Sequence, residues 1–582
     1  MEEKKVLLSV KDLEVKFRVR GRILTAIRGI SLDIYENESI AIVGESGSGK
    51  SVFTKTFAGM LENNGFISNG SVVFDDPELA KTDAALSPRA QRLIRNMERR
   101  LNSFSNLEFG GATYQEILAL KAEKTMKSTL SDEDAQKIED EISDLVFKKT
   151  ELANLRQTYD PHTEKDKIHE AGEQIRQLEA EIKAVQQRKE DLIKQHKQAV
   201  ESDAQYLKEY QEKLSALEAR YAKETAAEIS DEMRERNRII AKEIYLSVGR
   251  YPLTKQPVLI NKLLKACRKA MELGEDLRTE DVRNAVFDEI VLRVRYLDED
   301  EKKLHGVCVL NLAKINLPGD WSQIRGGKIA TVFQDPMTSL NPIITIGKQI
   351  TSVILKHQDC SEAEARAQAL ELMHAVGIPN AENRFDDYPF QYSGGMRQRI
   401  VIAIALSCRP KILICDEPTT ALDVTIQAQI LKLLKDLQKK FNYTIVFITH
   451  DLGVVANVAD RVAVLYAGQI VELGTVEEVF YDPRHPYTWA LLSSLPQLAQ
   501  KGMKLYSITG TPPSLYNSIR GDAFAPRNPY CLKVDTLAEP PMFQVTETHF
   551  AKTWLLDPRA PQIEKPDIID DIHGKLVRAF NI

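Results

Sequence analysis

The stretch SIAIVGESGSGKSVFTKTF, residues 39–57, decides the fold. An apolar segment of strand character precedes a glycine-rich loop, and a helical pattern follows it. In this context the glycines let backbone N–H groups wrap phosphate oxygens at a helix N-terminus. Lys50 is placed to reach the β- and γ-phosphates of a nucleotide, and the Ser51 hydroxyl to bind Mg²⁺. The residues predicted to bind the nucleotide here are Gly44, Glu45, Ser46, Gly47, Ser48, Gly49, Lys50 and Ser51.

Composition restricts the class of protein. The chain has 582 residues, 43% hydrophobic and 28% charged, which is typical of a soluble globular protein with three to four structural units. Lys and Arg total 78 against 84 Asp and Glu, so the net charge of −6 provides no overall basic field for nucleic acid. We expect a cytosolic chain, because no apolar run reaches the roughly 20 residues of a membrane span and the first residues lack a signal-peptide pattern. The six cysteines are scattered and are expected to be reduced thiols.

Glycine usage divides the chain. Residues 77–317 contain only six of the 28 glycines, whereas short apolar runs alternate with helical segments before and after this block. That alternation predicts an α/β fold with a parallel sheet. Within the block, apolar residues at heptad spacing between 138 and 152, and again between 168 and 221, predict an antiparallel coiled-coil hairpin around a turn at 159–162. Its arms have roughly 47 and 60 residues, or about 70 and 90 Å. Residues 229–317 are expected to form a small cap of shorter helices.

Two acids end a second predicted strand. Asp416 and Glu417 follow the apolar segment KILIC, residues 411–415. Asp416 at the strand end can hold the Mg²⁺ shell, and Glu417 can act as the general base that polarises the attacking water. An acid pair after a strand is often only a helix or turn cap, but the phosphate-binding loop upstream favours the catalytic interpretation.

Three further motifs resemble those of ABC ATPases. The segment SGGMRQR, residues 393–399, resembles their signature motif, while Gln334, Asp423 and His450 fall where that family has its Q-loop, D-loop and switch histidine. In this family two such domains enclose two ATP molecules between them. The resemblance implies catalytic roles for Glu417, His450 and Gln334, and Mg²⁺ contacts for Ser51, Gln334 and Asp416. It adds Phe17, Ser393, Gly394, Gly395 and Asp423 to the nucleotide-binding residues. For Phe17, stacking on adenine and burial in a strand are equally good interpretations.

The C-terminal part of the chain indicates which group of ABC ATPases the sequence resembles. DPRHPYT at 482–488 and GTPPS at 510–514 are similar to the extension of ATP-binding subunits of oligopeptide permeases, and FQDPMTSLNP and CDEPTTALDVTIQAQI match their D-type subunit. The resemblance covers about residues 1–76 and 319–582. It implies a peptide-transport ATPase that uses ATP and Mg²⁺ at the cytoplasmic face of the cell membrane. Its expected partners are an F-type ATPase subunit, two membrane permease subunits and, indirectly, an extracellular peptide receptor, with no nucleic acid.

One departure from the family concerns an iron–sulfur cluster. Many relatives hold a cluster in the extension through four cysteines, whereas the corresponding positions here are Asp522, Asn528, Asp535 and Thr553. Thiolates are the usual cluster ligands, so we expect no iron–sulfur cluster. Cys531 is alone and out of register with the pattern.

The domain organisation follows from these motifs. We expect the first part of the ATPase domain at 1–76, a helical insertion at 77–318, the second part of the ATPase domain at 319–480 and the importer extension at 481–582. The alternative function is a coiled-coil ABC ATPase of DNA repair or chromosome organisation. In those proteins the coiled coil separates the Q-loop from the signature, whereas here that interval is 393 − 334 = 59 residues and the insertion precedes it. Whether the insertion is a docking arm or a solvated decoration stays open.

Overall fold

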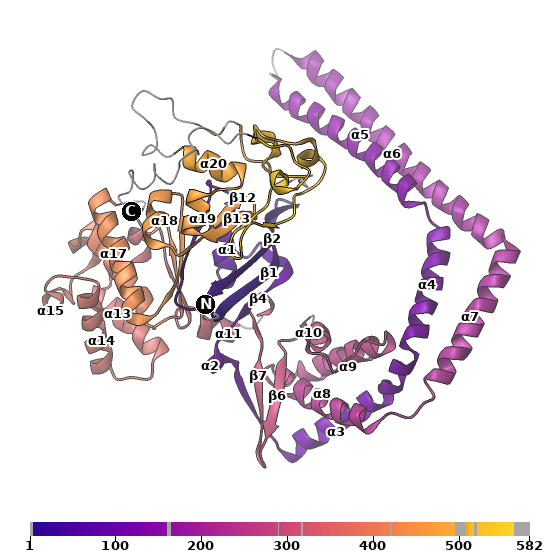
Figure 1. Ribbon diagram of the computed structural model, residues 1–582, viewed down its shortest axis with the longest axis horizontal. Coiled ribbons are helices and arrows are strands. Elements are labelled where there is room, and N and C mark those ends of the chain that lie inside the picture. Colours follow the sequence, from indigo (N-terminus) through magenta and orange to yellow (C-terminus); the bar gives the residue numbers. More distant parts are fainter. Residues whose placement is uncertain are drawn as a thin grey trace. The chain divides into compact units, whose positions relative to one another are not determined.

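The chain forms two compact units in the computed structural model. One comprises Met1–Lys81 and Cys308–Ile582, and the other Thr82–Val307 (Figure 1). The structure describes residues 4–159, 164–288, 290–315, 318–419, 422–494, 508, 510–516, 519 and 521–563.

A mostly parallel eight-stranded sheet forms the centre of the first unit. The strand order is β14-β15-β13-β12-β3-β11-β10-β9. In chain order the strands are β3 (Ser39–Val43), β9 (Ile329–Val332), β10 (Ile412–Asp416), β11 (Thr444–Thr449), β12 (Arg461–Tyr466), β13 (Gln469–Thr475), β14 (Phe543–Gln544) and β15 (Phe550–Ala551). The strands β12, β3, β11, β10 and β9 are parallel to one another, whereas β13 is antiparallel to β12. Their carboxyl ends therefore meet at one edge of the sheet, where ligands bind in open α/β sheets.

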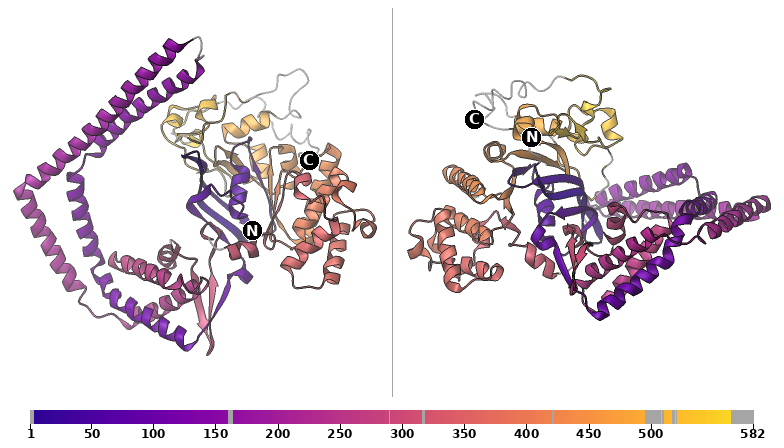
Figure 2. Two further views of the ribbon diagram at one scale, coloured as in Figure 1. Left: turned by 180° about the vertical axis from the view of Figure 1, so that it is seen from behind. Right: turned by 60° about the horizontal axis from the view of Figure 1, so that its bottom comes forward.

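Helices cover this sheet and supply its core (Figures 1 and 2). Apolar side chains of the helices and of β3, β10 and β11 form one buried cluster, which includes Val43, Ile350, Ile402 and Phe447. The helices of the unit are α1 (Lys50–Phe57), α2 (Pro77–Ala80), α11 (Pro318–Ile324), α12 (Pro336–Ser339), α13 (Ile346–His357), α14 (Glu362–Ala375), α15 (Ala381–Arg384), α16 (Gly394–Leu406), α17 (Val424–Phe441), α18 (Leu452–Val458), α19 (Val476–Tyr481) and α20 (Pro486–Ser493). The α/β prediction is confirmed.

A second, antiparallel sheet completes the first unit. Its order is β2-β1-β4-β8, with β1 (Val6–Val19), β2 (Arg22–Tyr35), β4 (Gly65–Phe74) and β8 (Leu310–Asn311). Strand β1 alternates as its sequence predicts, since Leu13, Val15 and Phe17 are buried and the residues between them are more exposed. Phe74 at the end of β4 lies opposite Leu310 in β8. The chain thus leaves the sheet and returns to it on neighbouring strands.

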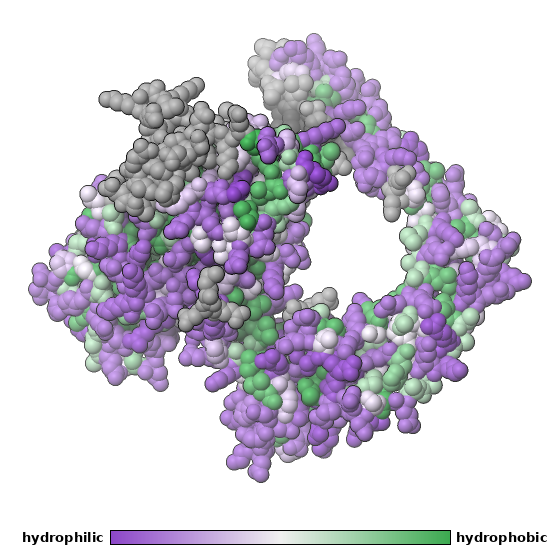
Figure 3. All heavy atoms as spheres, viewed as in Figure 1, coloured by the Kyte–Doolittle hydropathy of each residue, from purple (hydrophilic) through white to green (hydrophobic). Residues whose placement is uncertain are grey.

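The second unit is mainly helical. Its helices are α3 (Pro88–Ser105), α4 (Gly111–Lys127), α5 (Asp132–Thr158), α6 (Lys165–Ser202), α7 (Ala204–Glu224), α8 (Asp231–Gly249), α9 (Gln256–Glu272) and α10 (Glu280–Asp288). Lys149 pairs with Glu179 at 2.7 Å and Lys189 with Glu139 at 2.5 Å, an order that makes α5 and α6 antiparallel. The surface over these two helices is mostly hydrophilic (Figure 3).

Two breaks in the helices of this unit differ from the sequence prediction. The first expected arm is interrupted at residues 128–131, and the second is interrupted at Asp203. At these points the side chains of Ser131 and Asp203 accept hydrogen bonds from backbone N–H groups and so begin α5 and α7. The predicted turn at 159–162 lies largely outside the described residues.

The expected helical cap also contains a sheet. Its strands are β5 (Lys81–Ala85), β6 (Val294–Glu299) and β7 (Lys303–Cys308), in the order β5-β7-β6. Within residues 229–317, where only helices are expected, α10 ends at Asp288 and Val294–Glu299 forms β6. Residues 292–296, LRVRY, alternate apolar and polar side chains, a pattern typical of a strand rather than a helix.

The pairing of β4 with β8 predicts that the second unit is dispensable for folding of the first. Replacing residues 82–307 by a short Gly/Ser linker should leave a soluble protein that binds ATP, because the two chain ends already lie on adjacent strands and loop closure adds little entropy. Circular dichroism and ATP binding measure the outcome. An insoluble protein, or one that no longer binds ATP, would show that the second unit is part of the nucleotide-binding core.

Candidate nucleotide-binding site

The glycine-rich loop connects β3 to α1 in a conformation that only glycine permits. Gly44 has φ +153°, and a Cβ atom on it would lie 2.2 Å from the carbonyl oxygen of Leu465. Gly49 caps α1 with φ +105°, in the left-handed region. The loop can therefore present backbone N–H groups at the N-terminus of α1, which is the arrangement that binds phosphate oxygens.

Lys50 occupies the centre of this loop. Its Nζ donates hydrogen bonds to the carbonyl oxygens of Gly44 at 2.7 Å and Glu45 at 2.9 Å. Burial lowers the pKa of Lys50, while the nearby carboxylates of Glu417 and Asp416 raise it. A triphosphate is an anion that can replace these two carbonyl partners, so the loop fits a nucleotide.

Asp416 ends β10 beside this loop. The Ser51 hydroxyl donates to Oδ1 of Asp416 at 3.3 Å. Burial raises the pKa of Asp416, and the neighbouring charge of Glu417 raises it further. A hydroxyl and a carboxylate oxygen at this distance are hard oxygen ligands of the kind that Mg²⁺ binds together with substrate phosphates. The two residues therefore fit a magnesium ion.

Glu417 lies at the meeting point of three sequence motifs. Gln334 donates from Nε2 to Oε2 of Glu417 at 2.9 Å, and Nδ1 of His450 is 3.0 Å from Oε1. The backbone of Glu417 has φ +47°, and its N–H donates to the carbonyl of Ile448 at 2.9 Å. A left-handed non-glycine residue is strained, and such strain is stored mainly at functional sites. Side chains 83 and 33 residues distant in sequence thus converge on one carboxylate.

The signature residues lie on other elements. Ser393 caps α16, accepting from the N–H of Met396 at 3.4 Å, and Gly394 and Gly395 form the first turn of that helix. Asp423 precedes α17 and is exposed. In the part of the chain that the structure describes, these residues make no hydrogen bond or ion pair with residues of the glycine-rich loop. The N-terminus of α16 is therefore exposed on the same unit.

Phe17 also lies apart from the loop. It is 9% exposed in β1, and its ring packs directly over Gly65 in β4, where a Cβ atom would come within 2.7 Å of the ring. This geometry favours the buried-strand interpretation of Phe17. Its predicted stacking on adenine stays a prediction.

Sequence reasoning missed a contact between the glycine-rich loop and the C-terminal extension. Arg527 donates from Nη1 and Nη2 to the two carboxylate oxygens of Glu45 at 2.7 and 3.0 Å. The hydroxyl of Tyr487, in α20, accepts from the backbone N–H of Glu45 at 2.8 Å. The side chain of Arg527 is only 5% exposed and also donates to Tyr466 at 3.2 Å. The extension therefore holds the second residue of the loop by both its backbone and its side chain.

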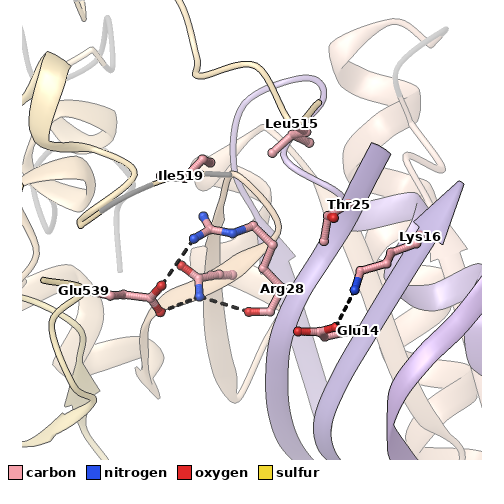
Figure 4. A pocket seen from close by; sticks show the side chains of 8 residues that line it. Glu14, Lys16, Thr25, Arg28, Leu515, Ile519 and Glu539 are labelled. Atoms are coloured by element: carbon pink, nitrogen blue, oxygen red, sulfur yellow. Dashed lines mark hydrogen bonds and ion pairs between the residues drawn. The ribbon is translucent and has the colours of Figure 1, made fainter. Parts of the chain in front are cut away.

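The extension contacts the antiparallel sheet as well. The N–H of Thr25 in β2 donates to the carbonyl of Leu515 at 3.1 Å. Beside this contact lies a cavity of about 380 Å³, in which Arg28 reaches from β2 to Glu539 of the extension (Figure 4). Gln469 donates to both the Arg28 carbonyl and the Glu539 carboxylate. None of the predicted site residues lines this cavity, so we interpret it as part of the packing of the extension.

The four positions aligned with cluster cysteines are buried polar residues. Each side chain accepts a hydrogen bond from a backbone N–H two or three residues away, at 2.5–3.3 Å: Asp522, Asn528, Asp535 and Thr553. Burial raises the pKa of Asp522 to about 6. Cys531 is exposed. Within the described ranges, no three His, Cys, Asp or Glu side chains are placed to hold a metal ion. This donor set does not fit an iron–sulfur cluster.

Comparisons with known proteins agree with the class of site that this geometry defines, a P-loop nucleotide-binding site on an α/β sheet. The ABC transporter family profile matches residues 27–158 and 296–420, and the profile of the oligopeptide/dipeptide transporter C-terminal region matches residues 471–534. The first match includes the glycine-rich loop, Gln334, the segment 393–399 and Glu417, and it also extends over residues 82–158 and 296–307 of the second unit; the second match falls on the extension.

Individual relatives are similar over most of their own length. The oligopeptide transport ATP-binding protein AmiE of Streptococcus pneumoniae serotype 4 is 65% identical over 266 residues, which cover 46% of this chain and 75% of AmiE. OppD of Bacillus subtilis, also an oligopeptide transport ATP-binding protein, is 59% identical over 45% of this chain and 73% of OppD. The dipeptide transport ATP-binding protein DppD of Lactococcus lactis is 61% identical over 43% and 72%. The chain belongs to the ABC transporter ATP-binding proteins.

The position of Glu417 predicts a loss of turnover without a loss of binding. Glu417→Gln keeps the shape of the side chain but removes the base, so ATP hydrolysis should fall by roughly 100-fold or more while ATP still binds. Steady-state hydrolysis and equilibrium ATP binding measure the two effects. The control is Glu382→Gln, because Glu382 is an exposed carboxylate that contacts a histidine, His374, at 2.7 Å on other helices. Near-normal turnover of Glu417→Gln would remove this residue from the role of base.

The contact of Arg527 with the loop predicts energetic coupling. Arg527→Gln and Glu45→Gln should each weaken ATP binding, by about tenfold, because the loop loses a buried bidentate ion pair. In a double-mutant cycle the two effects should be non-additive by about 1–2 kcal/mol. Arg559→Gln is the control, since Arg559 is an exposed arginine that pairs only locally with Asp557. Additive effects on ATP binding would show that the pair is only a stabilising contact of the fold.

Proposed function

We propose that this chain is the ATP-binding and ATP-hydrolysing subunit that powers an ABC importer of oligopeptides. The observation that carries the proposal is the convergence of Gln334 and His450 on Glu417, beside the glycine-rich loop, in a chain that also carries the transporter C-terminal region. ABC transporter ATP-binding proteins hydrolyse ATP to drive transport, and the similar proteins carry oligopeptide and dipeptide transport in their names.

The site residues have separate roles in ATP hydrolysis. Lys50 and the loop N–H groups bind the phosphates, while Ser51, Asp416 and Gln334 are the residues that would hold Mg²⁺. When bound, Mg²⁺ neutralises charge on the phosphate oxygens. Glu417 accepts a proton from the attacking water, and His450 holds the Glu417 carboxylate in position and senses the γ-phosphate.

The remaining site residues fit a dimer of ATP-binding domains. Ser393, Gly394 and Gly395 present the N-terminus of α16 to the nucleotide bound mainly by the partner domain, with Asp423 beside them. The proposed partner is a different, F-type ATP-binding subunit, and the pair works on two membrane permease subunits that receive peptides from an extracellular receptor. We place the chain at the cytoplasmic face of the cell membrane. No described helix is long and apolar enough to cross a bilayer.

Two further statements belong to this proposal. The second unit is proposed to be an antiparallel coiled-coil hairpin on a mixed base, inserted in the ATPase domain; the opposed pairing of α5 with α6 supports this. The extension is proposed to hold no iron–sulfur cluster, which the buried oxygen side chains at the cysteine positions support. The DNA-repair alternative is not supported, because the C-terminal match and the similar proteins are those of peptide transporters.

Isolation of the assembled complex tests this function. Affinity purification of the tagged chain from native membranes in mild detergent should recover two permease subunits and a second ATP-binding protein, identified by mass spectrometry. Cells that carry only the Glu417→Gln variant should recover the same complex but lose peptide uptake, because hydrolysis and not assembly is blocked. Recovery of chromosomal proteins or DNA in place of membrane subunits would contradict the proposal.

A further inference from the structure

A groove in the second unit is lined by arginine side chains together with apolar side chains. It has a volume of about 490 Å³ and is lined by α3, by α8 and by the first turns of α9. Arg89, Arg92 and Arg100 all line it, and its described lining contains no aspartate or glutamate. This local composition contrasts with the net charge of −6 of the whole chain.

The described residues do not neutralise the positive charge of the groove. Arg89 and Arg92 are exposed, and no carboxylate in the described ranges lies within ion-pair distance of either. Arg100 donates only to an amide oxygen, that of Asn261, at 2.8 Å. Helices α3 and α9 both begin at the groove, and neither has an acidic residue in its first turn. Their positive dipole ends therefore add to the arginine charge.

The groove also exposes apolar surface. Met97 and Ile260 lie at its buried side, whereas the side chain of Leu253 at its rim is 71% exposed. Figure 3 shows hydrophobic residues among hydrophilic ones where α8 and α9 lie. Tyr245 lines the groove as well, and arginine, tyrosine and methionine are the residue types enriched in protein–protein interfaces.

We propose that this groove is a docking site for an acidic segment of a partner protein, one that carries an apolar side chain between carboxylates. The carboxylates pair with Arg89 and Arg92, which have no such partner among the described residues, and the apolar side chain covers Leu253 and fills the space above Met97 and Ile260. The inference does not depend on the proposed transport function.

The arrangement favours a peptide over other anionic partners. Binding of a nucleic-acid backbone requires cations that follow successive phosphates, whereas these arginines surround an apolar depression. A membrane surface attracts clustered cations on an open face, whereas a groove of this volume suits the enclosure of side chains. A protein segment is the partner that supplies carboxylates and an apolar side chain together.

Binding of labelled peptides to the full chain tests the proposal. The probe is a short fluorescein-labelled peptide that alternates glutamate and leucine, and fluorescence anisotropy at physiological salt measures its affinity. One comparison peptide has lysine in place of glutamate, and another has serine in place of leucine. We expect the glutamate–leucine probe to bind and both comparison peptides to bind at least about tenfold more weakly, since each lacks one of the two recognised features.

Two matched pairs of variants locate the site. Arg89→Glu with Arg92→Glu should weaken probe binding by about tenfold or more, whereas Arg95→Glu with Arg99→Glu should change it little. Both doubles make the same charge change at exposed positions of α3, but Arg95 and Arg99 do not line the groove.

The second pair tests the apolar contact. Leu253→Ser should weaken binding by several-fold, and Val258→Ser, at a residue 58% exposed outside the groove, should not.

Three outcomes would overturn the proposal. The first is absence of probe binding. The second is equal loss in both arginine doubles, which would indicate an unspecific electrostatic attraction. The third is tighter binding of oligothymidylate or of phosphatidylglycerol vesicles than of the probe, with loss only in the Arg89 and Arg92 double, which would assign the groove to nucleic acid or lipid.

Discussion

The parallel pairing of β3, β11, β10 and β9 is the constraint on which the site depends. In this order Thr449 lies opposite Val43 and Asp416 opposite Ile448, so the segments that follow these strands begin at one edge of the sheet. The glycine-rich loop, His450 and Glu417 come directly after three of the strands, and Gln334 follows the fourth. These strands are buried on both faces, so a shift of one residue would exchange the side chains that pack on the two sides of the sheet; the packed core therefore fixes the register, and the register fixes the site.

The C-terminal extension is joined to this site through Glu45, not only through the sheet. A bidentate arginine pair with a carboxylate is directional, and the Arg527 side chain is nearly excluded from water, so displacement of the extension would leave a charged group buried without its partner. In the same region, oxygen side chains at the positions aligned with cluster cysteines bind backbone N–H groups. These hydrogen bonds and the aromatic packing of Tyr466, Tyr487 and Phe524 stabilise the extension.

The sequence was sufficient for the parts of the molecule that depend on local patterns. Strand alternation around Val15, the glycine-rich loop and the acids after β10 predicted the α/β core, whereas Gln334 and His450 were assigned from the resemblance to ABC ATPases. Local sequence patterns did not predict contacts between segments that are distant along the chain. Arg527 and Glu45 are 482 residues apart, and neither has a local pattern that marks the other. The breaks at Ser131 and Asp203 were missed for a different reason, because heptad spacing was weighed above helix-capping residues that were visible in the sequence.

The closeness of two chain ends and the burial of a core also explain how the second unit is accommodated within the chain. A large unit can enter a folded domain only where its two ends are close together, and neighbouring antiparallel strands provide such a place, as β4 and β8 do here at Phe74 and Leu310. Once this condition is met, the inserted unit needs its own core, and the buried ion pair of Arg293 with Glu243 at 2.9 Å lies in it. Residues on the surface of the second unit are then not constrained by the need to bind a nucleotide. Arg89 and Arg92 of α3 lie on that surface, and no described carboxylate pairs with either of them.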